Sequence, residues 1–251
     1  MDSCWASYRG DCSKKLSREH LVSKSLFESK TVLVHGFPWC KEEKEIGLHN
    51  LVTKNLCSFH NSSLSELDKE GASAWEIIKK VNRIDNQRKR MGARRWNVVK
   101  HKINGPLLER WFLKTLFNLS WDQPYIVGLK EDDSGSGNIC PKLAKIAFGE
   151  SNFLDESGLY TGDLNGQQIH SIEEVVFTPI IKDDKYILGG LFSFLGLNFF
   201  ISLTAPPKSE KPFNGLVGLD SDWQNSNIHY HMEKFNFKVR DKLSQVILFN
   251  W

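Results

Sequence analysis

The chain has 251 residues, of which 40% are hydrophobic and 25% charged, and its formal net charge is +3 at pH 7. This length and composition suit a folded protein with a substantial core and exclude wholesale disorder. Five cysteines are an odd number for a disulfide framework, and the first stretch, MDSCWASYRGDCSKK, lacks the apolar core of a secretory signal. We therefore expect a cytoplasmic protein with reduced thiols, in which clustered cysteines bind metal.

The first predicted unit spans residues 1–75. Residues 1–61 hold four of the five cysteines and four of the eight histidines in short, turn-rich stretches, which is typical of a small metal-stabilised module. The pattern then changes, because Ser63 and Glu66 have the spacing of a capping box and apolar residues follow at helical spacing. A helix is therefore predicted to begin near Ser62.

The remaining chain is divided into a basic helical segment, residues 76–120, and a β-rich domain, residues 121–251. In the middle segment, Gly105-Pro106 opens a helical stretch with enough apolar side chains to pack on a core. The β-rich part has DLNG and KDD turns between apolar runs. Residues 187–203 carry no charge and approach the minimum length of a membrane span, but their glycines and central LGLN favour two buried strands joined by a tight turn.

Charge is divided unevenly along the chain. Residues 1–118 carry 22 lysines and arginines against 13 acidic residues, a balance of +9, whereas residues 119–251 carry 11 against 17, a balance of −6. Ten basic residues and a single acid, Asp85, lie in residues 79–102. Such a run is either a solvated helix face or a surface that binds nucleic-acid phosphates. The candidate nucleic-acid-binding residues are Lys79, Lys80, Arg83, Arg88, Lys89, Arg90, Arg94, Arg95, Lys100 and Lys102.

A structural zinc site is predicted from four soft ligands, Cys4, Cys12, Cys57 and His60. Zinc prefers a tetrahedral set of thiolates and imidazoles, and Cys57 and His60 have the spacing of a zinc knuckle. The interval between Cys4 and Cys12 is wider than in the common short pair, so that Cys40 is an alternative ligand. The competing interpretation is that these cysteines are small buried thiols without metal.

Glu19, His20 and Asn61 flank this knuckle. Oxygen ligands from Glu19 and Asn61 suit a hard divalent cation, and His20 is a base that can activate water near neutral pH. These are the parts for phosphodiester hydrolysis, in which a cation contacts the scissile phosphate while His20 takes a proton from water. Singly, each residue has an ordinary explanation as a surface acid, a part-buried histidine or a helix cap. Their order within about sixty residues makes the pattern more specific.

Residues 1–75 resemble a divergent member of the HNH (ββα-metal) endonuclease superfamily. The residues that carry this resemblance are Cys12 and the stretches SREHLVSKSLF and NLCSFHNSSLSELD. The resemblance implies Mg²⁺ or Mn²⁺ held by Glu19 and Asn61, with His20 as the general base and His60 as a zinc ligand. The resemblance implies an N-terminal ββα-metal module. Together with the helical middle segment and the C-terminal, mainly antiparallel β domain predicted above, the expected fold class is α+β. His20 is expected near the end of the first strand, and Asn61 at a helix N-terminus that attracts the phosphate.

The middle residue of the HNH pattern, which helps to orient the base, is best matched by Asn50. His49 and Asn55 are alternatives, because the usual spacing falls near Val52. A second departure from the family pattern is Ser23, where a proline often follows the histidine.

The sequence thus predicts a metal-dependent endonuclease that acts on nucleic acid, and the expected substrate is DNA and not RNA. One alternative is a zinc-stabilised nucleic-acid-binding protein without catalysis. Another is a nuclease controlled by its C-terminal domain, as in restriction or phage defence. No membrane partner is expected, and cleavage of both strands by one site per chain would favour a homodimer or sequential nicking.

Overall fold

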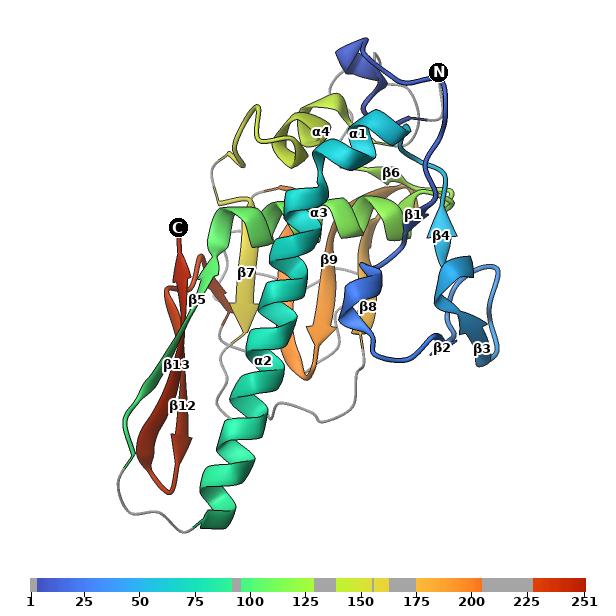
Figure 1. Cartoon of the computed structure of the whole chain (residues 1–251). Helices are drawn as coiled ribbons and strands as arrows, with labels where there is room; N and C mark the ends of the chain where they lie inside the picture. Colours follow the sequence, from blue (N-terminus) through green and yellow to red (C-terminus); the bar gives the residue numbers. More distant parts are fainter. Residues whose placement is uncertain (1–3, 92–95, 129–138, 155, 163–174, 205–227) are drawn as a thin grey trace.

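A computed structural model describes residues 4–91, 96–128, 139–154, 156–162, 175–204 and 228–251 (Figure 1). Helix α3 (Gly105–Ser120) lies at the centre, with the long helix α2 (Ser65–Met91) crossing one side of it and a six-stranded sheet on the other. One hydrophobic cluster of buried residues extends from Cys4 to Phe249. The fold is therefore mixed α and β, as predicted, and both ends of the chain contribute to one core.

Helix α3 is buried on both sides, and most of its buried side chains are apolar. Its first turn is capped by the Asn104 side chain, which accepts a hydrogen bond of 3.0 Å from the backbone N–H of Leu107, and Pro106 occupies the first turn. Phe112 packs against Phe192 and Phe199 of the sheet, with ring centroids 5.0 Å apart in both pairs. The prediction of a core-packing helix after Gly105-Pro106 is confirmed.

The six-stranded sheet follows the order β11-β7-β10-β9-β6, with β8 pairing with β9. All of its pairs are antiparallel except β6 with β9. Its strands are β6 (Ile126–Val127), β7 (Gly158–Gly162), β8 (Val175–Lys182), β9 (Tyr186–Phe194), β10 (Leu197–Ser202) and β11 (Ile228–Tyr230).

The uncharged run at residues 187–203 forms β9 and β10, joined by a turn at Leu195 and Gly196 with φ of 51° and 82°. The predicted pair of buried strands is therefore confirmed. Within the described residues, no helix combines the length and the hydropathy that crossing a membrane requires. The predicted KDD turn is also present, between β8 and β9, with positive φ at Asp183 and Asp184. The predicted DLNG turn lies outside the described residues.

A smaller sheet joins the C-terminal end of the chain to the middle. It has the order β12-β13-β5, in which β5 (Val99–Asn104) runs parallel to β13 (Lys242–Asn250), and β12 (Lys234–Val239) is antiparallel to β13. The sheet lies along the distal half of α2 (Figure 1), where Gln245 Nε2 donates to the Val81 carbonyl at 2.9 Å. Residues on both sides of the predicted boundary near 120 thus pair in one sheet.

The N-terminal part contains two short antiparallel pairs of strands. Strand β1 (Glu19–His20) pairs with β4 (Val52–Thr53), and β2 (Thr31–Val34) pairs with β3 (Lys44–Gly47) between them in sequence. Three 3₁₀ turns, η1 (Ser7–Arg9), η2 (Lys24–Leu26) and η3 (Leu48–Asn50), connect these elements. Helix α1 (Ser58–Ser63) follows β4, so the chain has a strand, strand, helix order around Glu19 and His20.

Two helix predictions were wrong in detail. Helix α1 begins at Ser58, four residues before the predicted start, because the Cys57 thiolate caps it by accepting from the backbone N–H of His60. Ser63 does not form the predicted capping box, since its hydroxyl donates to the His60 carbonyl at the end of α1. Helix α4 (Pro141–Ala147), within the β-rich part, was not predicted.

Helix α2 packs tightly on α3 at Gly71, where an added Cβ would overlap the indole ring of Trp111. We predict that Gly71→Ala destabilises the protein by about 1–3 kcal/mol through overpacking, although alanine is the better helix former. Chemical denaturation measures this change. The control is Ser73→Ala on the exposed face of α2, which should be neutral or slightly stabilising. Equal stability of the two variants would contradict the predicted packing constraint.

Candidate metal centre and catalytic site

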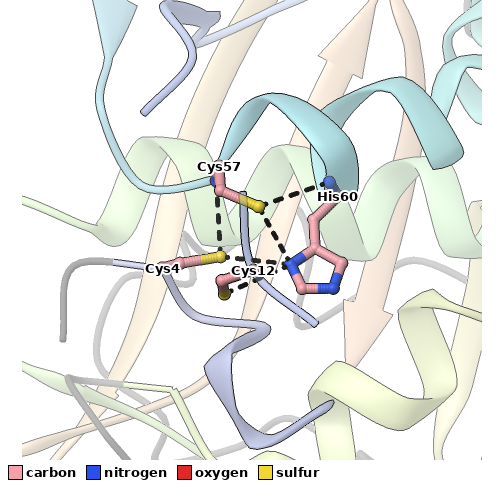
Figure 2. A group of neighbouring side chains, drawn as sticks. All are labelled: Cys4, Cys12, Cys57 and His60. Carbon is pink, nitrogen blue, oxygen red and sulfur yellow. Dashed lines mark hydrogen bonds between the residues drawn. The ribbon is translucent and has the colours of Figure 1, made fainter. Parts of the chain in front are cut away.

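The four predicted zinc ligands lie together. Their ligand atoms are all within 4.8 Å of one another (Figure 2). The Nδ1 atom of His60 is 3.4 Å from Cys4 Sγ, 3.6 Å from Cys12 Sγ and 3.3 Å from Cys57 Sγ. A tetrahedral zinc site with bonds of about 2.1–2.3 Å has ligand separations of about 3.4–3.8 Å. The donor set and its spacing therefore fit zinc, whereas Cys40 lies elsewhere and donates its thiol to the Val34 carbonyl.

The opposite side of the His60 ring meets a carboxylate. His60 Nε2 lies 2.7 Å from Asp11 Oδ1, and the imidazole itself is fully buried. A hydrogen bond from Nε2–H to Asp11 leaves Nδ1 unprotonated and directed at the three sulfur atoms. Asp11 was not predicted from the sequence. Its position one residue before Cys12 was the available signal.

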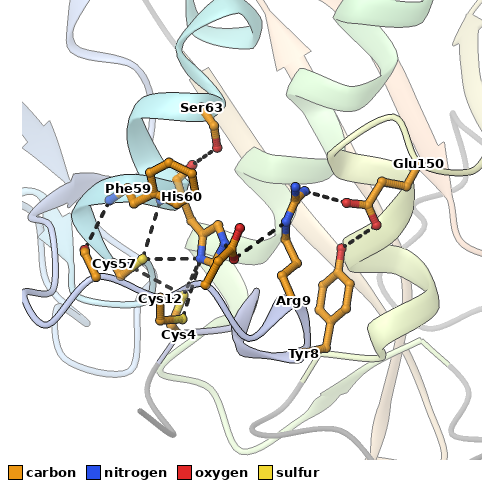
Figure 3. Close-up of polar contacts among 11 residues, drawn as sticks. Cys4, Tyr8, Arg9, Cys12, Cys57, Phe59, His60, Ser63 and Glu150 are labelled. Atoms are coloured by element: carbon orange, nitrogen blue, oxygen red, sulfur yellow. Dashed lines mark hydrogen bonds and ion pairs between the residues drawn. The ribbon is translucent and has the colours of Figure 1, made fainter.

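A polar network connects the cluster to the loop after α4 (Figure 3). Arg9 forms an ion pair with Glu150 and approaches Asp11 at 3.9 Å, and Tyr8 donates to Glu150 at 3.1 Å. The guanidinium of Arg9 also lies over the ring of Phe148, 4.6 Å from its centroid. The residues around the cluster thus attach the N-terminal segment to the central part of the protein.

The thiols of the cluster differ in acidity. Burial tends to raise the pKa of Cys57, but hydrogen bonds from the His60 backbone and from Ser13 outweigh it and lower that pKa to about 6. Burial raises the pKa of Cys4, and burial together with the neighbouring thiol of Cys4 raises the pKa of Cys12 to about 12. Without a cation, Cys57 is therefore the thiol that ionises first. A bound cation would favour ionisation of all three.

Glu19 and His20 occupy β1 and have different surroundings. The Glu19 carboxylate is buried, and its Oε1 lies 2.7 Å from Nζ of Lys114 on α3. Lys114 Nζ also lies 2.6 Å from Asp68 Oδ2 on α2. Burial raises the pKa of Glu19, and the Lys114 ammonium opposes this shift. The cation held by Glu19 in this structure is thus the ammonium of a lysine.

Neither Asp68 nor Lys114 was predicted as a site residue. Ser23, which stands where the HNH pattern often has proline, donates to Asp68 Oδ1 at 2.7 Å and accepts from the Trp111 indole at 3.1 Å. The available sequence signal was the charge of Lys114 in the otherwise apolar stretch WFLKTLFN, which indicates a buried lysine with an acidic partner.

His20 presents an imidazole suited to accept a proton. Burial is the main cause that lowers its pKa below the usual 6.5, and the positive charge of Lys24 contributes. Its Nε2 atom is buried and has no hydrogen-bond partner among the described residues. The backbone carbonyl of His20 accepts from Asn118 Nδ2 at 3.0 Å, which fixes the strand against α3. The imidazole is therefore neutral at physiological pH.

Asn61 lies in α1, not at its N-terminus as predicted, because the helix begins at Ser58. Its Nδ2 donates to Ser17 Oγ at 2.8 Å, two residues before Glu19. The segment before β1 runs antiparallel to the one after β4, since Ser17 N–H donates to the Leu56 carbonyl at 2.8 Å. Asn61 is thereby tied to the chain that carries Glu19 and His20.

The three candidates for the middle residue of the HNH pattern lie in different surroundings. Asn50 is exposed at the end of η3 and lines a cavity beside β4. Asn55 is fully buried and donates to Asn118 Oδ1 at 2.9 Å, which is a structural contact. His49 is exposed, and its carbonyl accepts from Arg18 at 2.7 Å. His49 and Asn50 are both exposed and polar, and of these two only Asn50 lines the cavity.

The basic run is partly used for internal contacts. Lys79 forms ion pairs with Glu28 and Glu76, and Arg88 donates to the carbonyls of Ser244 and Asn97. The exposed members within the described residues are Lys80, Arg83, Lys89 and Arg90 on α2 and Lys100 and Lys102 on β5. Arg94 and Arg95 lie outside the described residues.

Comparison with family models finds no match, and searches of curated proteins and of solved structures find no significant similarity.

We predict that the purified protein contains about one zinc ion per chain, bound by the Cys3His cluster. Cys57→Ser and His60→Ala should lose most of this zinc, because each removes one of four ligands, and a strong chelator should lower the thermal midpoint of the wild type. Elemental analysis and thermal unfolding measure these effects.

The matched control is Cys140→Ser, which changes a thiol outside the cluster and should leave the zinc content unchanged. A wild-type protein without zinc, or a Cys57→Ser protein with the wild-type content, would contradict the assignment.

Proposed function

We propose that the protein is a metal-dependent endonuclease that hydrolyses phosphodiester bonds, with DNA as the preferred substrate. The observation that carries the proposal is His20, on a strand whose other residue is the acidic Glu19. Burial lowers the pKa of its imidazole, and its Nε2 has no hydrogen-bond partner among the described residues. The order of β1, β4 and α1, with Cys57 and His60 at the start of the helix, further supports the likeness to a ββα-metal module.

In this proposal His20 takes the proton from the attacking water. A neutral imidazole is required for that step, and burial favours it. Glu19 and Asn61 would hold a divalent cation, Mg²⁺ or Mn²⁺, that stabilises negative charge on the phosphate. The donor set suits a hard cation, since carboxylate and amide oxygens are its usual ligands. Ligation by Glu19 requires that its carboxylate be released by Lys114 or shared with it.

Asp68, the second carboxylate partner of Lys114, also has a role in the proposal. Lys114 lies between Glu19 and Asp68, at 2.7 Å and 2.6 Å from their oxygens. When Glu19 turns to a metal ion, Asp68 keeps the ammonium paired, so that no buried charge is left alone. Removing this second partner would make the displacement of Lys114 unfavourable.

The exposed basic side chains on α2 support a long substrate. A helix rises about 1.5 Å per residue, so Asp68 beside the candidate site and Arg90 near the end of α2 are about 33 Å apart. This separation corresponds to about ten base pairs of duplex DNA. A substrate must therefore be at least this long to contact the basic end of α2 and the His20 strand together, and its binding should weaken with salt.

A second candidate function is zinc-stabilised binding of nucleic acid without cleavage. The buried pair of Glu19 and Lys114 favours it, because an ammonium occupies the carboxylate that a catalytic cation would need. Both candidates predict salt-dependent binding. They differ in what Glu19 and His20 contribute, and substitution of these two residues separates them.

We predict that the protein nicks supercoiled plasmid in the presence of Mg²⁺ or Mn²⁺, and that His20→Ala lowers the rate at least about a hundredfold, as loss of a general base does. Glu19→Gln should also lose cleavage while both variants keep their affinity for DNA. Gel analysis of nicking and a binding titration measure the two properties. His35→Ala, which changes an exposed histidine, is the control and should cleave normally.

Retained nicking by His20→Ala would exclude His20 as the base. Salt-dependent binding without nicking under any metal condition would support the non-catalytic binder instead.

The pH dependence of cleavage is also predicted. Because burial lowers the pKa of His20, the imidazole stays neutral at pH 6.5 and gains a proton only below it. The value of kcat/KM should therefore be constant near neutral pH and fall in acid, and the midpoint of this fall should lie below pH 6.5. Single-turnover rates across the pH range provide the measurement. A midpoint well above 6.5 would indicate that another group acts as the base.

A further inference from the structure

A cavity of about 250 Å³ is lined by residues of the loop between β2 and β3 and by residues at the C-terminal end of α3. Its walls include the aromatic rings of Phe37 and Trp39, the polar side chains of Asn50 and Asp122, and Val52 of β4. It is smaller than the sites of about 300–1,000 Å³ that enclose drug-sized ligands. Its size and mixed lining suit one flat, polar ring system.

The aromatic wall is partly open to solvent. Trp39 is 52% exposed and stacks on Phe37, with ring centroids 5.0 Å apart and planes at 20°. The loop that presents them is held by Cys40, whose N–H donates to the Phe37 carbonyl at 2.9 Å and whose thiol donates to Val34. A tryptophan kept at the surface by a braced loop offers a stacking surface that needs little ordering on binding.

The polar wall can read the edge of a ring. The Asp122 carboxylate accepts hydrogen bonds only, and the amide of Asn50 both donates and accepts. Nucleobases offer matching donors in their ring N–H and exocyclic amino groups, and matching acceptors in their carbonyl oxygens and unprotonated ring nitrogens. Arg18, which is not among the lining residues, donates to the carbonyl of His49 at 2.7 Å, so its guanidinium lies next to the peptide bond that precedes Asn50. A guanidinium in this place suits a phosphate adjacent to the bound ring.

The cavity adjoins the candidate base. Val52 is the direct partner of His20 in the β1–β4 ladder, so their side chains lie on the same face of the two strands. Asn118, another lining residue, donates to the His20 carbonyl at 3.0 Å. A ring bound here would hold its own backbone near His20.

We infer that this cavity binds one unpaired nucleobase of the substrate strand, stacked on Trp39 and hydrogen-bonded by Asn50 and Asp122. The inference rests on the proposed function and deepens it, because it assigns a substrate class to the site. A base inside a duplex cannot reach such a cavity unless it leaves the stack. The substrate is therefore a single strand, or a duplex with an unpaired or flipped base near the cleaved bond.

The test uses the full chain carrying His20→Ala, so that binding is measured without cleavage. A fluorescently labelled single-stranded oligonucleotide is titrated against this protein and against versions with Trp39→Ala, Trp39→Phe or Leu33→Ala. Loss of one stacked base should weaken binding of the Trp39→Ala protein between about fivefold and a hundredfold. Trp39→Phe should recover most of the affinity, and Leu33→Ala, which removes an exposed side chain of the same hairpin outside the cavity, should bind normally.

A second experiment uses a set of oligonucleotides of the same sequence, each of which lacks the base at one different position. One abasic position should weaken binding to the Trp39-containing protein and cause no additional loss in the Trp39→Ala protein, because both changes remove the same contact. Nucleoside monophosphates should bind much more weakly than the strand. Affinity for them equal to that for the strand would assign the cavity to a free nucleotide and overturn the inference.

Equal affinities of the folded Trp39→Ala and Trp39-containing proteins would also overturn the inference, while nicking by the wild-type chain would leave the proposed function intact. Absence of both nucleic-acid binding and nicking would reject the two together.

Discussion

The buried ammonium of Lys114 joins the three elements on which the candidate site depends. From the central helix α3 it contacts Glu19 of β1 and Asp68 of α2, so one cation sets the position of the strand that carries His20. Removing a single partner from such a buried pair typically costs about 3–5 kcal/mol, because the remaining charge stays desolvated. The arrangement also defines the functional question, since a catalytic cation would bind at the same carboxylate.

The Cys3His cluster also helps to position the segments around β1 and β4. It attaches the chain around Cys4 and Cys12 to the first turn of α1, and Asp11 fixes the orientation of His60. Short strands such as β1 and β4 bury little surface of their own, so they depend on this cluster and on α3 for their position. The Cys3His cluster and the buried ion pair of Glu19 and Lys114 together fix the segments that carry His20 and Asn61.

Residue type and local order were enough to predict some features. The four candidate zinc ligands were identifiable because few types of side chain bind zinc. Strands β9 and β10 were predictable because the uncharged run contains glycines and a central turn sequence, LGLN. Contacts between distant segments were not predictable: Lys114 contacts Asp68 across 46 residues, and Gln245 of β13 pairs with Val99 of β5 across 146 residues. The start of α1 was missed because a cysteine thiolate takes the place of the usual serine cap.

The central claim is that Glu19 and Asn61 bind a divalent cation beside His20. A crystal structure of the protein with Mn²⁺ tests it most directly, because anomalous scattering locates the ion independently of activity. The account predicts a manganese peak within coordination distance of Glu19 and Asn61, with Lys114 withdrawn from Glu19 and still paired with Asp68. A peak confined to other sites, with the ion pair of Glu19 and Lys114 intact at saturating Mn²⁺, would contradict it.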